Sequence, residues 1–305
     1  MTLRENEQLR VMKVKTWRTV NHHEAHALMA YHGSPFRSAF ILSFDGGGND
    51  GTWNAFLGQG LDVYRIARRD LNLGKVYEVV GSFLPAVTGL EPVLGKVCPQ
   101  VERETRDWSD AKIYWASEAR NSFAGKMMGY SGIKAPSAEA SSWMREMYQR
   151  AEGGHFEMPT ALLRMICESE EGRQIVAASA QDEFTKFVQP IVAKYLLNLK
   201  QKRVQVEGIV LVGGCALNVL NNQIIRETLT SFTSNSESSK PKDVYVPPAP
   251  NDAGLAIGAV YSLFPPTVQQ PLQYLGFPLF DLDTLEVGCP VGRPVLSSSC
   301  LGCCS

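Results

Sequence analysis

Long hydrophobic runs are absent from this sequence of 305 residues. No stretch approaches the roughly 18 consecutive apolar residues that are needed to cross a bilayer. The N-terminal segment, MTLRENEQLR, is polar and lacks the apolar part of a signal peptide. We therefore expect no contact with a membrane and a cytoplasmic location.

An excess of charge of either sign is also lacking. Lysine and arginine number 30 against 31 acidic residues, the formal net charge is -1, and no cluster of basic residues concentrates positive charge locally. Binding to a nucleic-acid backbone usually requires such a cluster, so nucleic acid is not an expected partner. The 44% of hydrophobic residues is ordinary for a globular chain and sufficient for a substantial core.

The order of the apolar runs predicts an α/β fold. SAFILSF, TWNAFLGQG and DVYRIARR predict a meander of three strands with the glycine-rich turn DGGGNDGT after the first. Residues 171–200 have apolar positions at helical spacing and predict a long helix, interrupted near Pro190. VEGIVLV predicts a buried strand that ends in GGCALN and opens a second helix, and VYVPP and GLAIGAVYSLF predict a last strand and helix.

Two regions do not follow this pattern. Residues 85–120 have poor periodicity and many charges, and they predict an irregular insertion with surface helices. Beyond residue 285 the pattern fades into serine, cysteine, glycine and proline, so residues 286–305 are predicted to be a disordered tail.

A candidate metal site begins with His22 and His26. The two residues stand four apart on a predicted helix, so both imidazoles project from one face and can reach a single ion. The alternative is that they are ordinary polar residues of the core or the surface. Asp252, predicted in a turn after a strand, would complete a set of two histidines and one carboxylate with open positions. His23 points elsewhere on the helix and is interpreted as a polar contact to substrate.

Two glycine-rich turns are candidate nucleotide-binding elements. In the turn from Asp45 to Thr52, glycines let backbone N–H groups approach a phosphate, and Asp45 could hold a metal-bound water. In the turn from Gly213 to Asn218, an adenosine can pass residues that have no side chain. Each turn has a simpler explanation, which is a hairpin turn for the first and a close-packed corner between strand and helix for the second.

Lys126 is a candidate phosphate ligand. It lies in the glycine-flanked segment AGKMMGYSG, predicted as a loop that could place the ammonium group on a phosphate. The simpler alternative is an ordinary surface lysine.

Six motifs in a fixed order give the sequence a resemblance to a known family: VNHHEAHALMAYHGSPF, ILSFDGGGNDGT, NLGKVYEVV, AGKMMGYSG, IVLVGGCALNVLNN and VPPAPNDAGLAIGAVY. Over residues 15–285 the chain resembles the NodU/CmcH-type carbamoyltransferases. The resemblance implies an actin/Hsp70-like duplicated fold of the RNase H-like (ASKHA) class. It also implies transfer of a carbamoyl group to a hydroxyl of a small-molecule acceptor from carbamoyladenylate, which is formed from carbamoyl phosphate and ATP.

The resemblance further implies roles for individual residues. A divalent metal of the iron type would be held by His22, His26 and Asp252, and His23 and Lys126 would take part in catalysis. The nucleotide-binding residues that it implies are Asp45, Gly46, Gly48, Thr52, Gly213, Gly214 and Asn218. The motif of Lys126 would contribute Gly125, Met128 and Gly129 as well.

Two departures from the family pattern lead to further expectations. Only about twenty residues precede the His helix, so residues 1–37 are interpreted as the remnant of a largely missing first lobe and residues 38–285 as the nucleotide-binding lobe. The apolar face of the His helix, which includes Leu28, Met29 and Tyr31, is then expected to lack part of its partner. No donor-forming domain follows, so this chain, truncated at both ends, is expected not to make its own carbamoyladenylate.

Other functions stay open at this stage. One alternative is a catalytically inactive remnant that binds nucleotide or a partner protein. A plain actin-like ATPase or sugar kinase would share the glycine-rich turns but would not call for the His helix, so metal content separates it from a transferase. The acceptor is not determined by the sequence, and homo-oligomerisation is left open.

Overall fold

The computed structural model describes residues 18–89, 123–153, 157–231 and 243–269. All of them belong to one compact unit, Met1–Pro271. The predicted insertion lies outside the described residues from position 90 onward, and so does the predicted tail. The domain boundaries at 37 and 285 stay predictions. Among the described residues, no helix combines the length and apolar character needed to cross a membrane.

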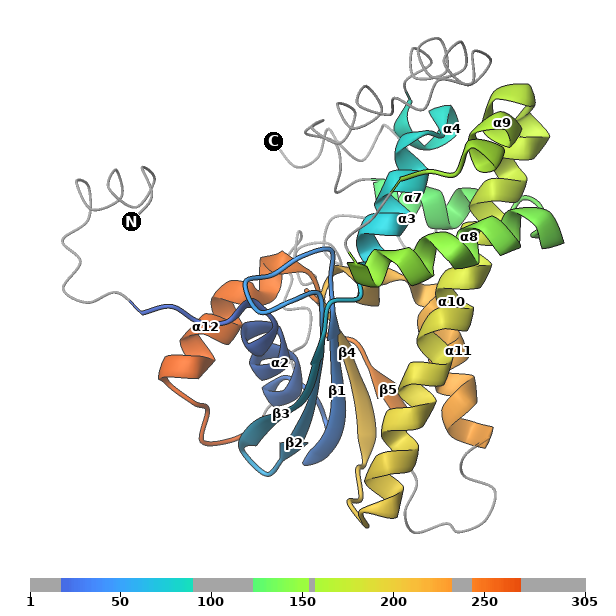
Figure 1. Ribbon diagram of the computed structural model, residues 1–305. Coiled ribbons are helices and arrows are strands. Elements are labelled where there is room, and N and C mark those ends of the chain that lie inside the picture. Colours follow the sequence, from blue (N-terminus) through green and yellow to red (C-terminus); the bar gives the residue numbers. More distant parts are fainter. Residues whose placement is uncertain (1–17, 90–122, 154–156, 232–242, 270–305) are drawn as a thin grey trace, which may run out of the picture. The chain divides into compact units, whose positions relative to one another are not determined.

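A mixed five-stranded sheet in the order β3-β2-β1-β4-β5 forms the centre of this unit (Figure 1). The strands are β1 (Ser38–Phe44), β2 (Trp53–Gln59), β3 (Asp62–Arg69), β4 (Gly208–Val212) and β5 (Asp243–Tyr245). β1, β2 and β3 pair antiparallel, which confirms the predicted meander, whereas β4 runs parallel to β1 and β5 parallel to β4. β1 and β4 are buried almost throughout because both faces of the sheet are covered.

Different helices cover the two faces of the sheet (Figure 1). On one face, α2 (His22–His32) contacts β1, β2 and β4, and α12 (Leu255–Leu263) packs against α2. On the other face, apolar residues of β1 and β4 enter the main hydrophobic core together with the remaining helices. These helices are α3 (Leu73–Ser82), α4 (Pro85–Thr88), α7 (Phe123–Tyr130), α8 (Ala138–Arg150), α9 (Thr160–Glu168), α10 (Glu170–Gln201) and α11 (Val219–Ser231).

Helix α10 runs continuously through Pro190, so the predicted interruption near this residue is wrong. Proline cannot donate the backbone hydrogen bond of a regular helix, and its ring crowds the preceding turn. Ser169 caps the start of α10 by accepting from the N–H of Gly172 at 2.9 Å. Val188 and Val192, which flank the proline, are buried in the core and hold the helix in place across the missing bond.

Helices α2 and α12 cross at a glycine. A Cβ at Gly258 would lie 1.9 Å from the carbonyl oxygen of Ala25, so only glycine lets the two backbones approach this closely. At Gly254, in the turn before α12, a Cβ would lie 2.5 Å from Cε of Met29. The backbone contact at Gly258 therefore sets how α12 lies on α2, and the turn before α12 packs on the side chain of Met29.

The apolar side of α2 is covered, contrary to the expectation that it lacks a partner. Met29 and Tyr31 are fully buried, and Leu28 is half-buried. The ring of Tyr31 packs on Gly58 of β2, and its hydroxyl donates to the carbonyl of Arg37 at 2.6 Å. The expectation fails because α12 and the sheet supply the contacts that it assigned to another lobe. Several exposed apolar residues lie instead on α12 and directly after it, at Ile257, Val260, Leu263 and Phe264.

Candidate metal centre

The helix that carries the histidines begins against the glycine-rich loop after β1. Its N-cap residue, Asn21, accepts no hydrogen bond from the helix through its side chain. The loop supplies the caps instead, because Oδ1 of Asn49 accepts from the N–H of His22 at 2.8 Å and Oδ1 of Asp50 accepts from that of His23 at 3.0 Å. The first turn of α2 is thus fixed by residues that lie 27 positions further along the chain.

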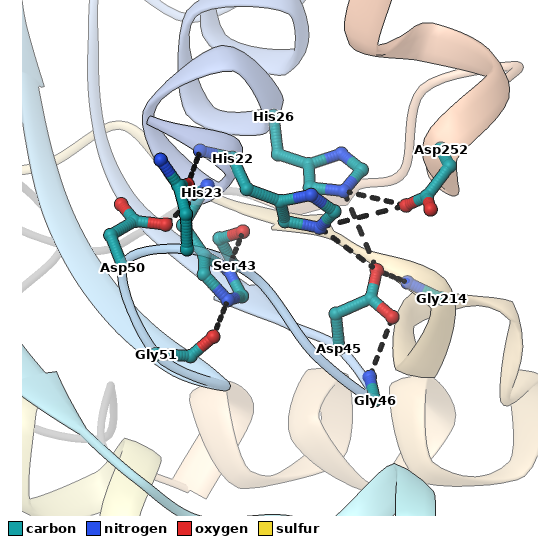
Figure 2. A network of polar contacts seen from close by, with 11 residues as sticks. His22, His23, His26, Ser43, Asp45, Gly46, Asp50, Gly51, Gly214 and Asp252 are labelled. Carbon is teal, nitrogen blue, oxygen red and sulfur yellow. Dashed lines mark hydrogen bonds and ion pairs between the residues drawn. The ribbon is translucent and has the colours of Figure 1, made fainter. Parts of the chain in front are cut away.

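Four side chains converge on one point (Figure 2). His22 and His26 come from α2, Asp45 directly follows β1, and Asp252 begins the short helix η6 (Asp252–Gly254) before α12. One ligand atom from each lies within 4.8 Å of the other three. Nε2 of His26 is 3.4 Å from Oδ2 of Asp45 and 3.4 Å from Oδ1 of Asp252, and the corresponding distances for His22 are 3.8 and 3.6 Å. The structure brings the three predicted ligands together and adds Asp45, which the sequence placed in the phosphate turn.

The imidazoles of this cluster lack ordinary hydrogen-bond partners. His26 is fully buried, and within the described part of the chain neither of its ring nitrogens is hydrogen-bonded. The same holds for Nε2 of His22. Leaving a buried polar group unpaired costs roughly 1–3 kcal/mol. The arrangement therefore favours a further group that binds these nitrogens.

Asp45 is the electrostatic centre of the cluster. Its Oδ1 accepts from the N–H of Gly46 at 2.6 Å, and its Oδ2 accepts from that of Gly214 at 2.7 Å. Burial opposes ionisation of Asp45, but His22, His26 and these two N–H groups outweigh it and hold the pKa of the carboxyl well below its ordinary value. Asp45 in turn raises the pKa of His22 against the effect of burial. At neutral pH Asp45 is therefore an anionic carboxylate.

His23 is engaged within the fold rather than exposed to a substrate. Its ring is fully buried, with Nε2 2.9 Å from the carbonyl oxygen of Gly51 and Nδ1 2.7 Å from Oγ of Ser43 (Figure 2). A carbonyl oxygen can only accept, so Nε2 carries the proton and Nδ1 accepts from the Ser43 hydroxyl. Burial lowers the pKa of His23, which agrees with a neutral ring. Instead of the expected contact with substrate, His23 makes two hydrogen bonds that connect β1 with the loop after it.

The two glycine-rich turns lie side by side because β1 and β4 are neighbouring parallel strands. Gly213 has a φ of 91°, and a Cβ there would lie 2.2 Å from the carbonyl oxygen of the last residue of β1, so close packing requires this glycine. A Cβ at Gly214 would lie 3.1 Å from Oδ1 of Asp45, and one at Gly48 would lie 2.9 Å from Cδ2 of His22. These two glycines leave room for the side chains of the cluster formed by His22, His26, Asp45 and Asp252.

Residues Gly46 to Gly48 form the open part of the first turn. Gly47 and Gly48 are exposed, and a Cβ at Gly47 would meet nothing within 4 Å. The carbonyl of Thr52 closes the turn by accepting from the N–H of Asp45 at 3.0 Å. The Thr52 hydroxyl is buried and, among the described residues, has no hydrogen-bond partner. A phosphate can thus approach the backbone of this turn more readily than the packed corner at Gly213.

Asn218 lies in a buried polar network. Its side-chain amide exchanges two hydrogen bonds with Gln181 of α10, at 3.1 and 2.9 Å. Its Oδ1 also accepts from the N–H of Asn221 at 3.0 Å and so caps α11. A nucleotide contact of Asn218 would require this network to open, and the geometry favours a structural role.

Lys126 lies on a helix and not in the predicted loop. It is an exposed residue of α7, which packs against α3, α4 and α10. A different lysine, Lys75 in the first turn of α3, lies beside the glycine-rich loop. Its Cε is 3.6 Å from the position that a Cβ of Gly46 would occupy.

The sequence did not predict that Asp45 joins the two histidines and Asp252, or that Asn49 and Asp50 cap α2. One signal was available, because a carboxylate directly after a central strand lies at the same sheet edge as the turn after a neighbouring parallel strand. No pattern in the sequence connects His23 with Ser43, since their contact depends on how α2 packs on β1.

Comparisons with known proteins bear on the chain as a whole. The sequence profile of the family described as Carbamoyltransferase N-terminus matches residues 2–261. A search of curated proteins gives no match. The crystal structure of T. kodakarensis HypF is similar with a TM-score of 0.42 and 16% identity, over 80% of this chain and 36% of that chain. The crystal structure of full-length HypF in the phosphate- and nucleotide-bound form is similar with a TM-score of 0.38 and 18% identity, over 82% of this chain and 36% of that chain. This chain thus spans little more than a third of the length of either HypF structure.

Proposed function

The chain belongs to the carbamoyltransferase N-terminus family, and from this premise we propose that it transfers a carbamoyl group from carbamoyladenylate to a hydroxyl of a small-molecule acceptor. In this reaction a bond forms between the acceptor oxygen and the carbamoyl carbon. The bond from that carbon to the phosphate oxygen of the adenylate breaks, AMP leaves with the electron pair, and the hydroxyl proton is released. The adenylate is formed in turn from carbamoyl phosphate, ATP and water, with release of phosphate and pyrophosphate.

The observation that carries this proposal is the cluster of His22, His26, Asp45 and Asp252 within 4.8 Å, inside the region matched by the family. Its residues fit a divalent metal. Around an ion that binds nitrogen and oxygen at about 2.1 Å, neighbouring ligand atoms lie roughly 3–3.5 Å apart. The four distances between imidazole nitrogens and carboxylate oxygens, 3.4–3.8 Å, are close to this spacing. Two imidazoles with carboxylates suit iron(II) among other first-row metals, and iron is the metal that we propose.

Each residue of the cluster has a definable task in this proposal. His22, His26, Asp45 and Asp252 would hold the metal, which when bound supplies stabilisation of negative charge on the carbamoyl oxygen. The N–H groups of Gly46 and Gly214 keep Asp45 ionised and oriented. We assign His23 to positioning of α2 rather than to acceptance of the proton, because both of its ring nitrogens are already engaged.

We propose that the nucleotide binds along the turn from Asp45 to Thr52. The support is the exposed backbone of Gly47 and Gly48 and the unpartnered hydroxyl of Thr52 within the described part of the chain. Gly213 and Gly214 border this turn through the contact between Gly214 and Asp45.

The sheet also supports a proposal on the wider fold. A meander of three antiparallel strands joined to two parallel strands in the order β3-β2-β1-β4-β5 is the order of the RNase H-like lobe, from which actin/Hsp70-like proteins are built. We therefore interpret the described unit as one such lobe. The six motifs in turn support placement with the NodU/CmcH-type enzymes, whose acceptors are small molecules.

Release of AMP from preformed carbamoyladenylate tests the proposed reaction. The wild-type chain, loaded with iron(II), is expected to release AMP faster when a panel of small hydroxyl compounds is added, whereas His26→Ala loses this increase. Asp62→Asn is a matched control, because Asp62 is an exposed carboxylate at the start of β3. Equal AMP release by the wild type and His26→Ala across the panel would contradict the proposal.

A further inference from the structure

The lysine that faces the glycine-rich loop is Lys75, not the lysine that the sequence motif suggests. Lys75 lies in the first turn of α3, and its Nζ is 3.8 Å from the position that a Cβ of Gly46 would occupy. Its stem lies over Gly46, since Cε is 3.6 Å from the same position. A Cβ at position 46 would therefore be in ordinary van der Waals contact with the end of the Lys75 side chain.

The backbone around this ammonium group offers hydrogen-bond donors. Among the described residues, the N–H groups of Gly47 and Gly48 donate no hydrogen bond. The start of α3 lies directly against the loop, because a Cβ at Gly74 would be 3.2 Å from the nitrogen of Gly46. The side chain of Asn72, the N-cap residue of α3, makes no capping hydrogen bond. The N–H groups of Gly47 and Gly48 and the buried, unpartnered hydroxyl of Thr52 belong to the same loop as Gly46, and each is a donor from which an anion can accept.

Lys75 adds a positive charge beside the loop. The loop borders the cluster that contains the carboxylates of Asp45 and Asp252, and an ammonium group favours an anion there. Lys75 is held by Glu78, whose Oε2 is 3.1 Å from Nζ, and the two side chains are 30% and 21% exposed. The ammonium group is thus kept beside the loop while it stays accessible to an incoming anion.

Resting on the proposed function, we infer that Lys75 and the N–H groups of Gly47 and Gly48 bind a phosphate group at this site, and that Lys126 does not. The shared chemistry is a phosphate monoester or free phosphate dianion. Its source is either the nucleotide or the phosphate of carbamoyl phosphate. Lys126, exposed on α7, serves as the matched lysine outside the site.

Calorimetric titrations of AMP, adenosine and inorganic phosphate into the metal-loaded full chain test this inference. Lys75→Met is expected to weaken AMP binding by about tenfold or more, because a charge-assisted hydrogen bond is lost. It should leave adenosine binding within about twofold. Lys75→Arg should restore most of the AMP affinity, and Lys126→Met should bind AMP as the wild type does. Lys75-dependent binding of inorganic phosphate alone would identify free phosphate as a source, and Lys75 dependence confined to AMP would identify the nucleotide.

The outcomes separate this inference from the proposed function. If the wild type binds AMP and Lys75→Met binds it equally well, the inference is wrong while the nucleotide site stands. Equal weakening of AMP and adenosine by Lys75→Met would also overturn it, because packing rather than phosphate recognition would then be affected. A wild-type chain that binds none of the three compounds would overturn both the inference and the proposed nucleotide site.

Discussion

Nε2 of His26 and Oδ2 of Asp45 lie 3.4 Å apart, which sets a fully buried imidazole against the carboxylate that follows β1. His22 and Asp252 lie at similar distances, and a cation shared among the four side chains would account for their convergence. The contact links the helical side of the site to the sheet side, and the first prediction tests it.

Removal of either partner is expected to abolish stoichiometric metal binding. His26→Ala and Asp45→Asn should each weaken affinity for iron(II) by more than the roughly 10- to 100-fold that loss of a supporting contact costs. Elemental analysis and competition titration measure this effect. Chelation should lower the melting temperature of the wild type and of Asp62→Asn, but not of the two site variants. Retention of a full equivalent of metal by Asp45→Asn would exclude Asp45 as a ligand.

The two hydrogen bonds of His23, which connect β1 with the loop after it, are expected to stabilise the fold and, through α2, to support metal binding. His23→Ala leaves the Ser43 hydroxyl and the Gly51 carbonyl unpaired in the core, and it should lower the free energy of unfolding by about 3 kcal/mol. Ser43→Ala, which removes one of the two contacts, should cost about 1 kcal/mol. A double-mutant cycle measured by urea unfolding should give a favourable coupling between the two side chains. Strict additivity would show that the hydrogen bond between them contributes nothing.

A pH dependence is expected from His32, which lies away from the cluster at the end of α2. Its ring is buried, neither nitrogen has a partner among the described residues, and burial lowers its pKa. The unfolded chain therefore takes up the proton near the ordinary pKa of about 6.5, while the folded chain does not. The free energy of unfolding is therefore at its full value above that pKa. It decreases as the pH falls through that pKa, because only the unfolded chain takes up the proton. Relative to His32→Leu, the wild type should accordingly lose unfolding free energy when the pH is lowered from 7.5 to 5.5. An unchanged difference between the two proteins would mean that His32 is paired or exposed.

The crossing of α2 and α12 is expected to tolerate no side chain. Gly258→Ala places a Cβ 1.9 Å from the carbonyl oxygen of Ala25, so the helices must separate, at a cost of about 2 kcal/mol or more. Because Asp252 precedes α12, metal affinity should fall together with stability. Gly125→Ala is the matched control, since a Cβ at this helical glycine of α7 would meet nothing within 4 Å and should be neutral or stabilising by up to about 1 kcal/mol. Similar melting temperatures for the two variants would contradict the close contact at Gly258.

Much of the fold and part of the site follow from local patterns. The apolar runs of β1 and β4 predict their strands because burial on both faces leaves few polar positions, and the spacing of His22 and His26 predicts a shared helical face. Asp45 could not be assigned to the same group from the sequence, because its place depends on β4 lying next to β1. That Lys75 and not Lys126 lies beside the glycine-rich loop could not be predicted for the same reason. It depends on the packing of α3 against this loop.

The loop from Asp45 to Thr52 has a consequence for how this family can diverge. Its first residue belongs to the cluster, Asn49 and Asp50 hold the helix that carries the histidines, and the carbonyl of Thr52 closes it onto Asp45. Adding or deleting one residue would displace either the carboxylate or the helix start. Relatives that keep the two histidines are therefore expected to keep the length of this loop even where they change its composition. An insertion in this loop would mark a relative that has lost the reaction.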